Sequence, residues 1–218
     1  MLLRRLQDLL GGIYDVDAGC DVRDFVTSDR GVLPEALRAA GTDEQLLVQP
    51  GPSEVAMSLY LDRAVLERLE AADPLEALHG RNLGDFWTAL EGVSHFLCVA
   101  WNARHDRDVS VLELEMQAEI DKYVTSCWLL HRQSPGRFPS ELHGLLFERT
   151  RIDPVLAGER AGLYREATQY AARFCRGVEG RLRDAQRREA ARPVVESVLR
   201  RFYRMPQGQK CAFIGQLG

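Results

Sequence analysis

Residues 84–132 have the sequence GDFWTALEGVSHFLCVAWNARHDRDVSVLELEMQAEIDKYVTSCWLLHR. Apolar residues recur every three or four positions in two runs, 85–104 and 110–131, which is the period of an α-helix. The polar segment HDRD lies between them and predicts a short turn. Ser110 followed by Glu113 is a capping box, which fixes the start of the second helix. This stretch therefore predicts two long antiparallel helices, around which we expect the rest of the chain to pack.

The remaining sequence favours a mainly α fold with a small α+β segment near the N-terminus. Residues 45–49 and 54–61 are rich in Leu and Val and flank a Pro-Gly-Pro-Ser turn, which predicts a β-hairpin. Helical patterns fill most of residues 62–218. We predict a helical bundle around the long antiparallel helix pair, preceded by an α+β segment over residues 1–61 that packs on it.

Shorter signals set further boundaries. Leucines at positions 2, 3, 6, 9 and 10 have helical spacing, and the Gly-Gly pair that follows predicts the end of that helix. Because a lone hairpin is only marginally stable, a further strand is expected beside it, and residues 14–16 and 24–27 are the candidates. A long helix is predicted over residues 159–190, and Pro193 should break or kink it.

Composition narrows the class of protein. A hydrophobic fraction of 45% and a charged fraction of 28% are those of a globular domain. No apolar run approaches the ~18 uncharged residues of a membrane span. The five cysteines are widely spaced and odd in number, which predicts free thiols and a cytoplasmic location. Phosphate-loop, dinucleotide-binding and serine-hydrolase motifs are absent from the sequence, so those functions have no support from it.

The first long helix carries a polar stripe on an otherwise apolar surface. Helical geometry places five polar residues within roughly one third of its circumference. Burial of charge is costly unless the charge is paired or bound. The stripe therefore marks either a solvent-facing edge of the helix or a polar seam inside the bundle. Its members are Thr88, Glu91, His95, Cys98 and Asn102.

Antiparallel register brings two residues of the second helix level with this stripe. With the turn centred near residue 107, His95 lies level with Glu119, and Glu91 lies level with Tyr123. Carboxylates and histidine are ligands of Fe, Mn and Zn, so a dinuclear iron or manganese centre is one interpretation. The spacing Glu-x-x-x-His departs from the Glu-x-x-His of ferritin-like centres, which leaves a structural Glu–His contact as the alternative. The predicted metal ligands are Glu91, His95 and Glu119, with Thr88, Asn102 and Tyr123 as polar neighbours.

The other acidic residues of the second helix have simpler interpretations. Glu113 is accounted for by the capping box and the positive end of the helix dipole. Glu119 and Lys122 are spaced as an ion pair on one helix face. Glu115 and Asp121 are expected to be solvated.

The C-terminal part of the chain is basic. Residues 173–210 contain 11 basic and 4 acidic residues, a net charge of +7 in a chain whose total is −4. An arginine-rich helix can contact nucleic-acid phosphates. No helix-turn-helix, RNA-recognition or zinc-finger signature accompanies it, so a solvated face that pairs with acidic helices is the alternative. The predicted anion or nucleic-acid contacts are Arg181, Arg183, Arg187, Arg188, Arg200, Arg201 and Arg204.

Together these features favour a protein that acts by binding or assembly, through a protein partner or as a homo-oligomer. The sequence contains no complete catalytic constellation, and its two parts carry opposite charge. Two alternatives remain open: a carboxylate–histidine metalloprotein with redox or hydrolytic activity, and nucleic-acid binding through the arginine-rich end.

Overall fold

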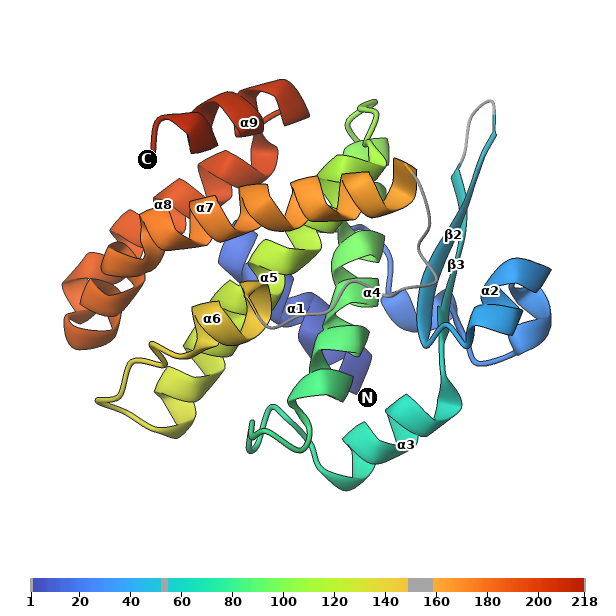
Figure 1. The fold of residues 1–218 in the computed structure, drawn as a ribbon, viewed down its shortest axis with the longest axis horizontal. Coiled ribbons are helices and arrows are strands. Elements are labelled where there is room, and N and C mark those ends of the chain that lie inside the picture. The colour runs from blue at the N-terminus through green and yellow to red at the C-terminus, as the bar shows by residue number, and fades with distance from the viewer. Residues whose placement is uncertain (1, 52–54, 149–158, 218) are drawn as a thin grey trace. The chain divides into compact units, whose positions relative to one another are not determined.

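The fold is mainly helical with a small three-stranded sheet, as the sequence predicts (Figure 1). The computed structural model describes residues 2–51, 55–148 and 159–217. The chain falls into two compact units, one formed by Met1–Gly11 and Val16–Asp108, the other by Gly12–Asp15 and Val109–Gly218. This division lies between the two long helices. The sequence-based division, an α+β segment over residues 1–61 packed on a helical bundle over residues 62–218 within one compact domain, stays a prediction.

The first unit consists of a sheet with helices packed on it. Its sheet has the strand order β1-β3-β2, with β1 parallel and β2 antiparallel to β3. The described helices and strands are α1 (Leu2–Tyr14, whose last turn belongs to the second unit), the 3₁₀ turns Val22–Asp24 and Arg30–Val32, β1 (Val26–Thr27), α2 (Glu35–Ala40), β2 (Glu44–Pro50), β3 (Val55–Leu61), α3 (Arg63–Ala71) and α4 (Leu83–Ala103).

The predicted hairpin is confirmed, and Figure 1 shows β2 and β3 side by side as a long two-stranded hairpin. Part of its connecting turn, residues 52–54, lies outside the described residues. Of the two candidates for a third strand, the one at residues 24–27 is correct, since Val26 pairs with Leu59. The other is wrong, because Tyr14 ends α1 instead of starting a strand.

The predicted end of the first helix is also wrong, because α1 continues through Gly11 and Gly12 to Tyr14. Glycine costs a helix about 1 kcal/mol relative to alanine, so burial of other side chains must offset it. Ile13 and Tyr14 are both buried, and the Tyr14 hydroxyl donates a hydrogen bond to Asp121. Tertiary packing therefore extends the helix by a turn beyond its glycine stop.

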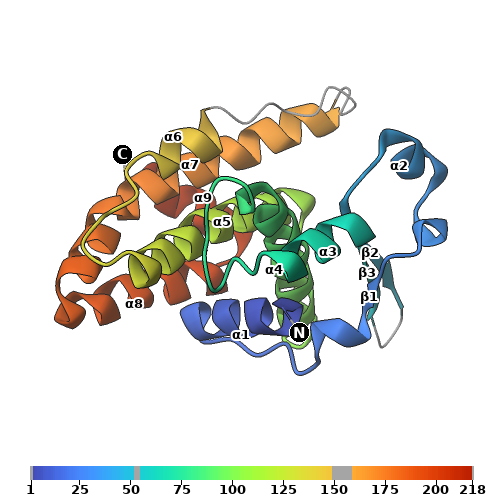
Figure 2. The ribbon, with the colours of Figure 1, turned by 90° about the horizontal axis from the view of Figure 1, so that it is seen from below.

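All regular secondary structure in the described residues of the second unit is helical. Its helices are α5 (Val111–Gln133), α6 (Leu142–Phe147), α7 (Glu159–Arg187), the 3₁₀ turn Glu189–Ala191, α8 (Arg192–Arg204) and α9 (Gln207–Gly215). Figure 1 and Figure 2 show α7 lying along α5, and this is the most extensive helix contact of the unit. Pro193 lies in the first turn of α8, where its missing N–H costs nothing.

A line of buried polar side chains runs along α5 at four-residue spacing: Glu113, Gln117, Asp121 and Thr125. Gln117 Nε2 donates to Asp121 Oδ1 over 2.8 Å, and the Tyr14 hydroxyl donates to the same oxygen. The prediction that Asp121 and Glu115 are solvated is wrong, since they are only 1% and 8% exposed. Nearly every residue from 115 to 127 is buried. This part of α5 therefore has no solvent-exposed face on which Glu115 and Asp121 could lie.

All five cysteines are free thiols, as predicted, and three of them are buried. Burial raises the pKa of Cys127 to about 12 and also raises the pKa of Cys175. At pH 8 these two thiols therefore stay protonated, and the thiolate is the reactive form. Desolvation also raises the pKa of Cys20, partly offset by Arg104.

We expect iodoacetamide to label Cys20 and Cys211 in the native protein at pH 8, Cys20 more slowly than an exposed thiol. Cys98, Cys127 and Cys175 should react only after unfolding. Peptide mass spectrometry at timed intervals measures this order. Labelling of Cys127 as fast as Cys211 would contradict the buried position of α5.

Candidate metal centre

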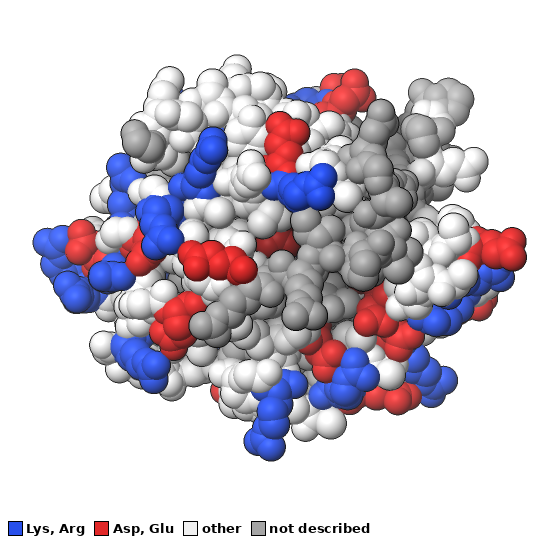
Figure 3. Space-filling model, viewed as in Figure 1, with Lys and Arg blue, Asp and Glu red and all other residues white. Residues whose placement is uncertain are grey.

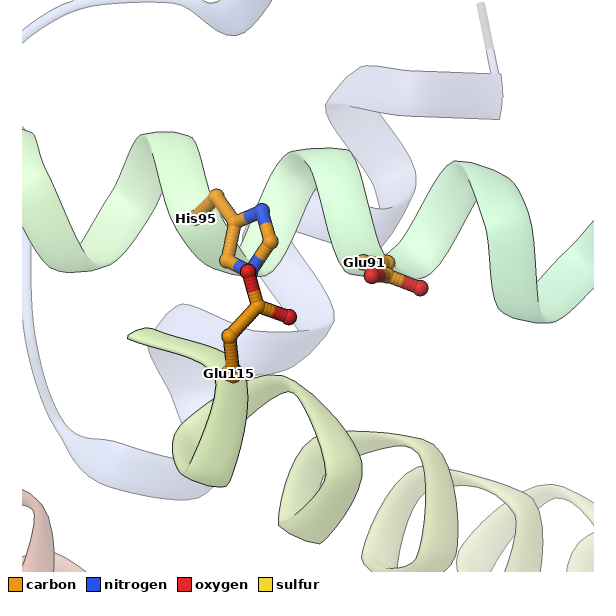
Figure 4. A group of neighbouring side chains, drawn as sticks. All are labelled: Glu91, His95 and Glu115. Atoms are coloured by element: carbon orange, nitrogen blue, oxygen red, sulfur yellow. The ribbon is translucent and has the colours of Figure 1, made fainter. Parts of the chain in front are cut away.

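The candidate centre begins with two side chains of α4, Glu91 and His95. Their four-residue spacing places them on the same face of the helix, one turn apart (Figure 4). A carboxylate oxygen of Glu91 and a ring nitrogen of His95 lie within 4.8 Å of each other. His95 is buried and Glu91 is half-buried. The polar stripe is therefore largely enclosed, which excludes the interpretation of a fully solvated edge at His95.

Strand β2 contributes a third ionisable side chain, Glu44, which the sequence did not single out. Its Oε1 lies 3.6 Å from His95 Nδ1. The side chains of Glu44 and His95 are only 11% and 8% exposed, so this contact is shielded from water. A carboxylate beside Nδ1 favours the tautomer that carries its hydrogen there, and this leaves Nε2 as the atom suited to bind a metal.

Gly92 lies at the point where the sheet, with Glu44, approaches α4 most closely among the described glycines of this helix. A Cβ at this position would lie 3.0 Å from Glu44 Cγ and 2.8 Å from Leu59 Cδ1. The contact with Leu59 is shorter than real Cβ atoms show, so a side chain at position 92 would have to displace Leu59 and press on Glu44. A glycine within an apolar helix marks such close approaches. Gly92, together with an acidic residue immediately before the predicted strand 45–49, is the signal that could have revealed Glu44.

The predicted polar neighbours on α4 are hydrogen-bonded within their own helix. The Thr88 hydroxyl donates to the carbonyl oxygen of Gly84 over 3.2 Å. Asn102 Nδ2 donates to the carbonyl oxygen of Cys98 over 2.9 Å and also approaches its sulfur. These bonds satisfy the amide nitrogen and the hydroxyl locally, so neither residue is needed to explain the geometry around His95.

The remaining predicted members belong to α5 in the second unit. Glu119 accepts from Lys122 Nζ over 2.8 Å, which confirms the predicted ion pair. Tyr123 is fully buried among aromatic rings, and burial raises the pKa of its phenol. The predicted approach of Glu119 and Tyr123 to α4 stays a prediction. Figure 4 also labels Glu115, another carboxylate-bearing residue of α5.

The predicted arginine contacts at the basic end are mostly neutralised within the second unit. Four of the seven make ion pairs, three of them with a carboxylate four residues earlier in the chain. Lys and Arg side chains alternate with Asp and Glu on the face drawn in Figure 3. This favours the interpretation of a solvated, internally paired surface over a phosphate-binding patch. The paired residues are Arg183, Arg188, Arg200 and Arg204, and the exposed others are Arg181, Arg187 and Arg201.

Two further findings bear on function. Across the described ranges, no helix has both the length and the apolar character needed to cross a membrane. The sequence matches no protein-family model, and it matches no curated protein and no solved structure. Inference about function therefore depends on the geometry of the site alone.

Proposed function

We propose that this protein binds a divalent transition-metal ion on α4, with His95 and Glu91 as ligands and Glu44 as the residue that orients the imidazole. The observation that carries the proposal is the enclosed His95 ring with two carboxylates near it, that of Glu44 at 3.6 Å and that of Glu91 within 4.8 Å. Two ligands of one tetrahedral ion lie roughly 3.4 Å apart, so a small closure of Glu91 toward His95 suffices.

The donor set limits the metals that the site suits. One imidazole with carboxylates suits Zn, Fe or Mn, whereas Ca²⁺ and Mg²⁺ prefer oxygen ligands alone. Glu44 fits the pattern in which a carboxylate fixes the tautomer of a metal-bound histidine and raises its basicity. Two protein ligands would leave coordination positions for water or substrate, and redox and hydrolytic metal centres also keep a position open, although most of them have three protein ligands.

Metal titration of chelator-treated protein by calorimetry tests this assignment. We expect His95→Ala and Glu91→Gln to abolish binding of Zn²⁺ or Mn²⁺. Glu44→Gln should weaken it about 10- to 100-fold, because it removes an orienting contact and not a ligand. The matched control is His79→Ala, which deletes an exposed imidazole. Equal affinity in the His95→Ala and His79→Ala proteins would show that the binding is adventitious.

The sequence-based prediction adds a carboxylate of α5 to this ligand set. Glu119→Gln and Glu115→Gln, two substitutions on the same helix, test that addition in the same titration. A loss of affinity in one variant and not in the other identifies the residue concerned. Unchanged affinity in both means that α5 contributes no ligand, and the assignment of His95 and Glu91 is tested independently.

A further inference from the structure

The outer edge of strand β2 has few of the features that normally prevent an edge strand from pairing with another chain. In the part of the chain that the structure describes, β2 is the terminal strand of its sheet and pairs with β3 over seven residues in continuous register. Its sequence is EQLLVQP, in which Glu44 is the sole charged residue. Edge strands are normally protected against pairing by lysines, bulges or short length. β2 has Pro50 at its end and a hydrogen bond from Gln45 Nε2 to the Leu46 carbonyl oxygen over 3.0 Å, which pairing with another strand would replace.

The hydrogen bonds of β3 show which groups of β2 point outward. The N–H of Leu59 donates to the carbonyl oxygen of Phe25, over 2.8 Å, and so points toward β1. Leu46, which lies opposite Leu59, therefore does not exchange hydrogen bonds with it. Because such pairs alternate along an antiparallel ladder, Leu46 and Val48 direct both N–H and C=O to the outer edge. The backbone of Pro50 also faces the outer edge. The N–H that proline lacks would therefore not have bonded to β3.

We propose that two copies of this chain associate through β2, paired antiparallel about Leu47 to form one continuous sheet. The segment from Gln45 to Gln49 reads Gln-Leu-Leu-Val-Gln, which is nearly the same in both directions. Gln45 then lies opposite Gln49 of the second copy, Leu46 opposite Val48, and Leu47 opposite Leu47. The outward N–H and C=O groups of Leu46 and Val48 meet in this register as hydrogen-bonded pairs.

A second copy fits this edge better than an unrelated strand does. A two-fold interface needs a self-complementary surface, and a near-palindromic strand is one. No like charges face each other, since Glu44 would lie opposite Pro50. Val48 is 43% exposed, and the pairing places it beside Leu46 of the second copy. The interface thus covers one of the few large apolar side chains that the described surface exposes.

Sedimentation equilibrium tests the proposal with three variants. The wild-type protein should be a dimer at micromolar concentration. Leu47→Lys places two ammonium groups across a pair whose Cα atoms are about 4.5 Å apart, so we expect at least tenfold weaker association. Val48→Pro removes an outward N–H without breaking a bond to β3 and should also give monomers. Ala56→Lys adds the same charge to an exposed position of β3 and should remain dimeric.

Disulfide trapping tests the register. Leu47→Cys brings two sulfurs together across the two-fold axis, within the Cα separation that a disulfide needs, so oxidation should give a covalent dimer. Gln45→Cys lies four residues from its own counterpart and should not cross-link. A monomeric wild-type protein, dimers that persist in Leu47→Lys, or dissociation by Ala56→Lys would each overturn the proposal. Equal cross-linking of the two cysteine variants would overturn the pairing about Leu47.

Discussion

Lys210→Met is expected to lower the free energy of unfolding by about 3–5 kcal/mol, because it leaves a buried carboxylate without its counter-charge. Lys210 Nζ lies 2.7 Å from Glu113 Oε1, and the two side chains are 1% and 4% exposed. The ammonium also lies 5.6 Å from the ring centroids of Phe202 and Tyr203. Methionine keeps the length and apolar volume of the lysine stem, so the change isolates the loss of charge.

Urea denaturation followed by circular dichroism measures the effect. The exposed pair of Arg137 and Glu141 provides the matched control, because Arg137→Met should cost less than about 1 kcal/mol. Adding Glu113→Gln to Lys210→Met removes the orphaned charge, and the double variant should recover part of the loss. Equal stability of the Lys210→Met and Arg137→Met proteins would contradict burial of this ion pair.

Gly92→Ala is expected to destabilise the protein by about 1–3 kcal/mol through overpacking, although alanine is the better helix former by about 1 kcal/mol. The new methyl group would meet Leu59 and Glu44 from the sheet, and Leu59 is fully buried. Displacement of Glu44 also removes the carboxylate beside His95. We therefore expect metal affinity to fall about tenfold or more, as for other losses of an orienting residue.

Gly84→Ala is the control for this change. Gly84 lies in the first turn of the same helix, and a Cβ there would meet no atom within 4 Å. This substitution should be neutral or slightly stabilising and should leave metal affinity unchanged. Thermal denaturation and calorimetric titration of both variants give the comparison. If Gly92→Ala behaves like Gly84→Ala in both measurements, the close approach of β2 to α4 is not as described.

Local signals were enough to predict most of the fold. The capping box at Ser110 and the apolar spacing on either side predicted both long helices, and Ser110 does accept from the N–H of Glu113. Alternating Leu and Val around a Pro-Gly turn predicted the hairpin. These features depend on residues near one another in sequence, so propensity and periodicity capture them.

Contacts between distant residues were not predictable in the same way. The pairing of Glu113 with Lys210 and of Asp121 with Tyr14 joins positions about a hundred residues apart, and the sequence gives no register for either. Sequence alone therefore predicted that Glu115 and Asp121 face solvent. For the candidate site, helical spacing predicted that Glu91 and His95 share a face. It could not supply Glu44, which lies on strand β2 and reaches His95 where the sheet packs closely against α4 at Gly92.

Metal content of protein purified without chelators tests directly whether His95 and Glu91 hold a metal ion. Elemental analysis should find about one equivalent of Zn, Fe or Mn per chain in the wild-type protein. His95→Ala, prepared in parallel, should contain less than about a tenth of that amount, since it removes a ligand outright. No stoichiometric metal in the wild-type protein, or the same content in His95→Ala, would show that His95 is not a metal ligand.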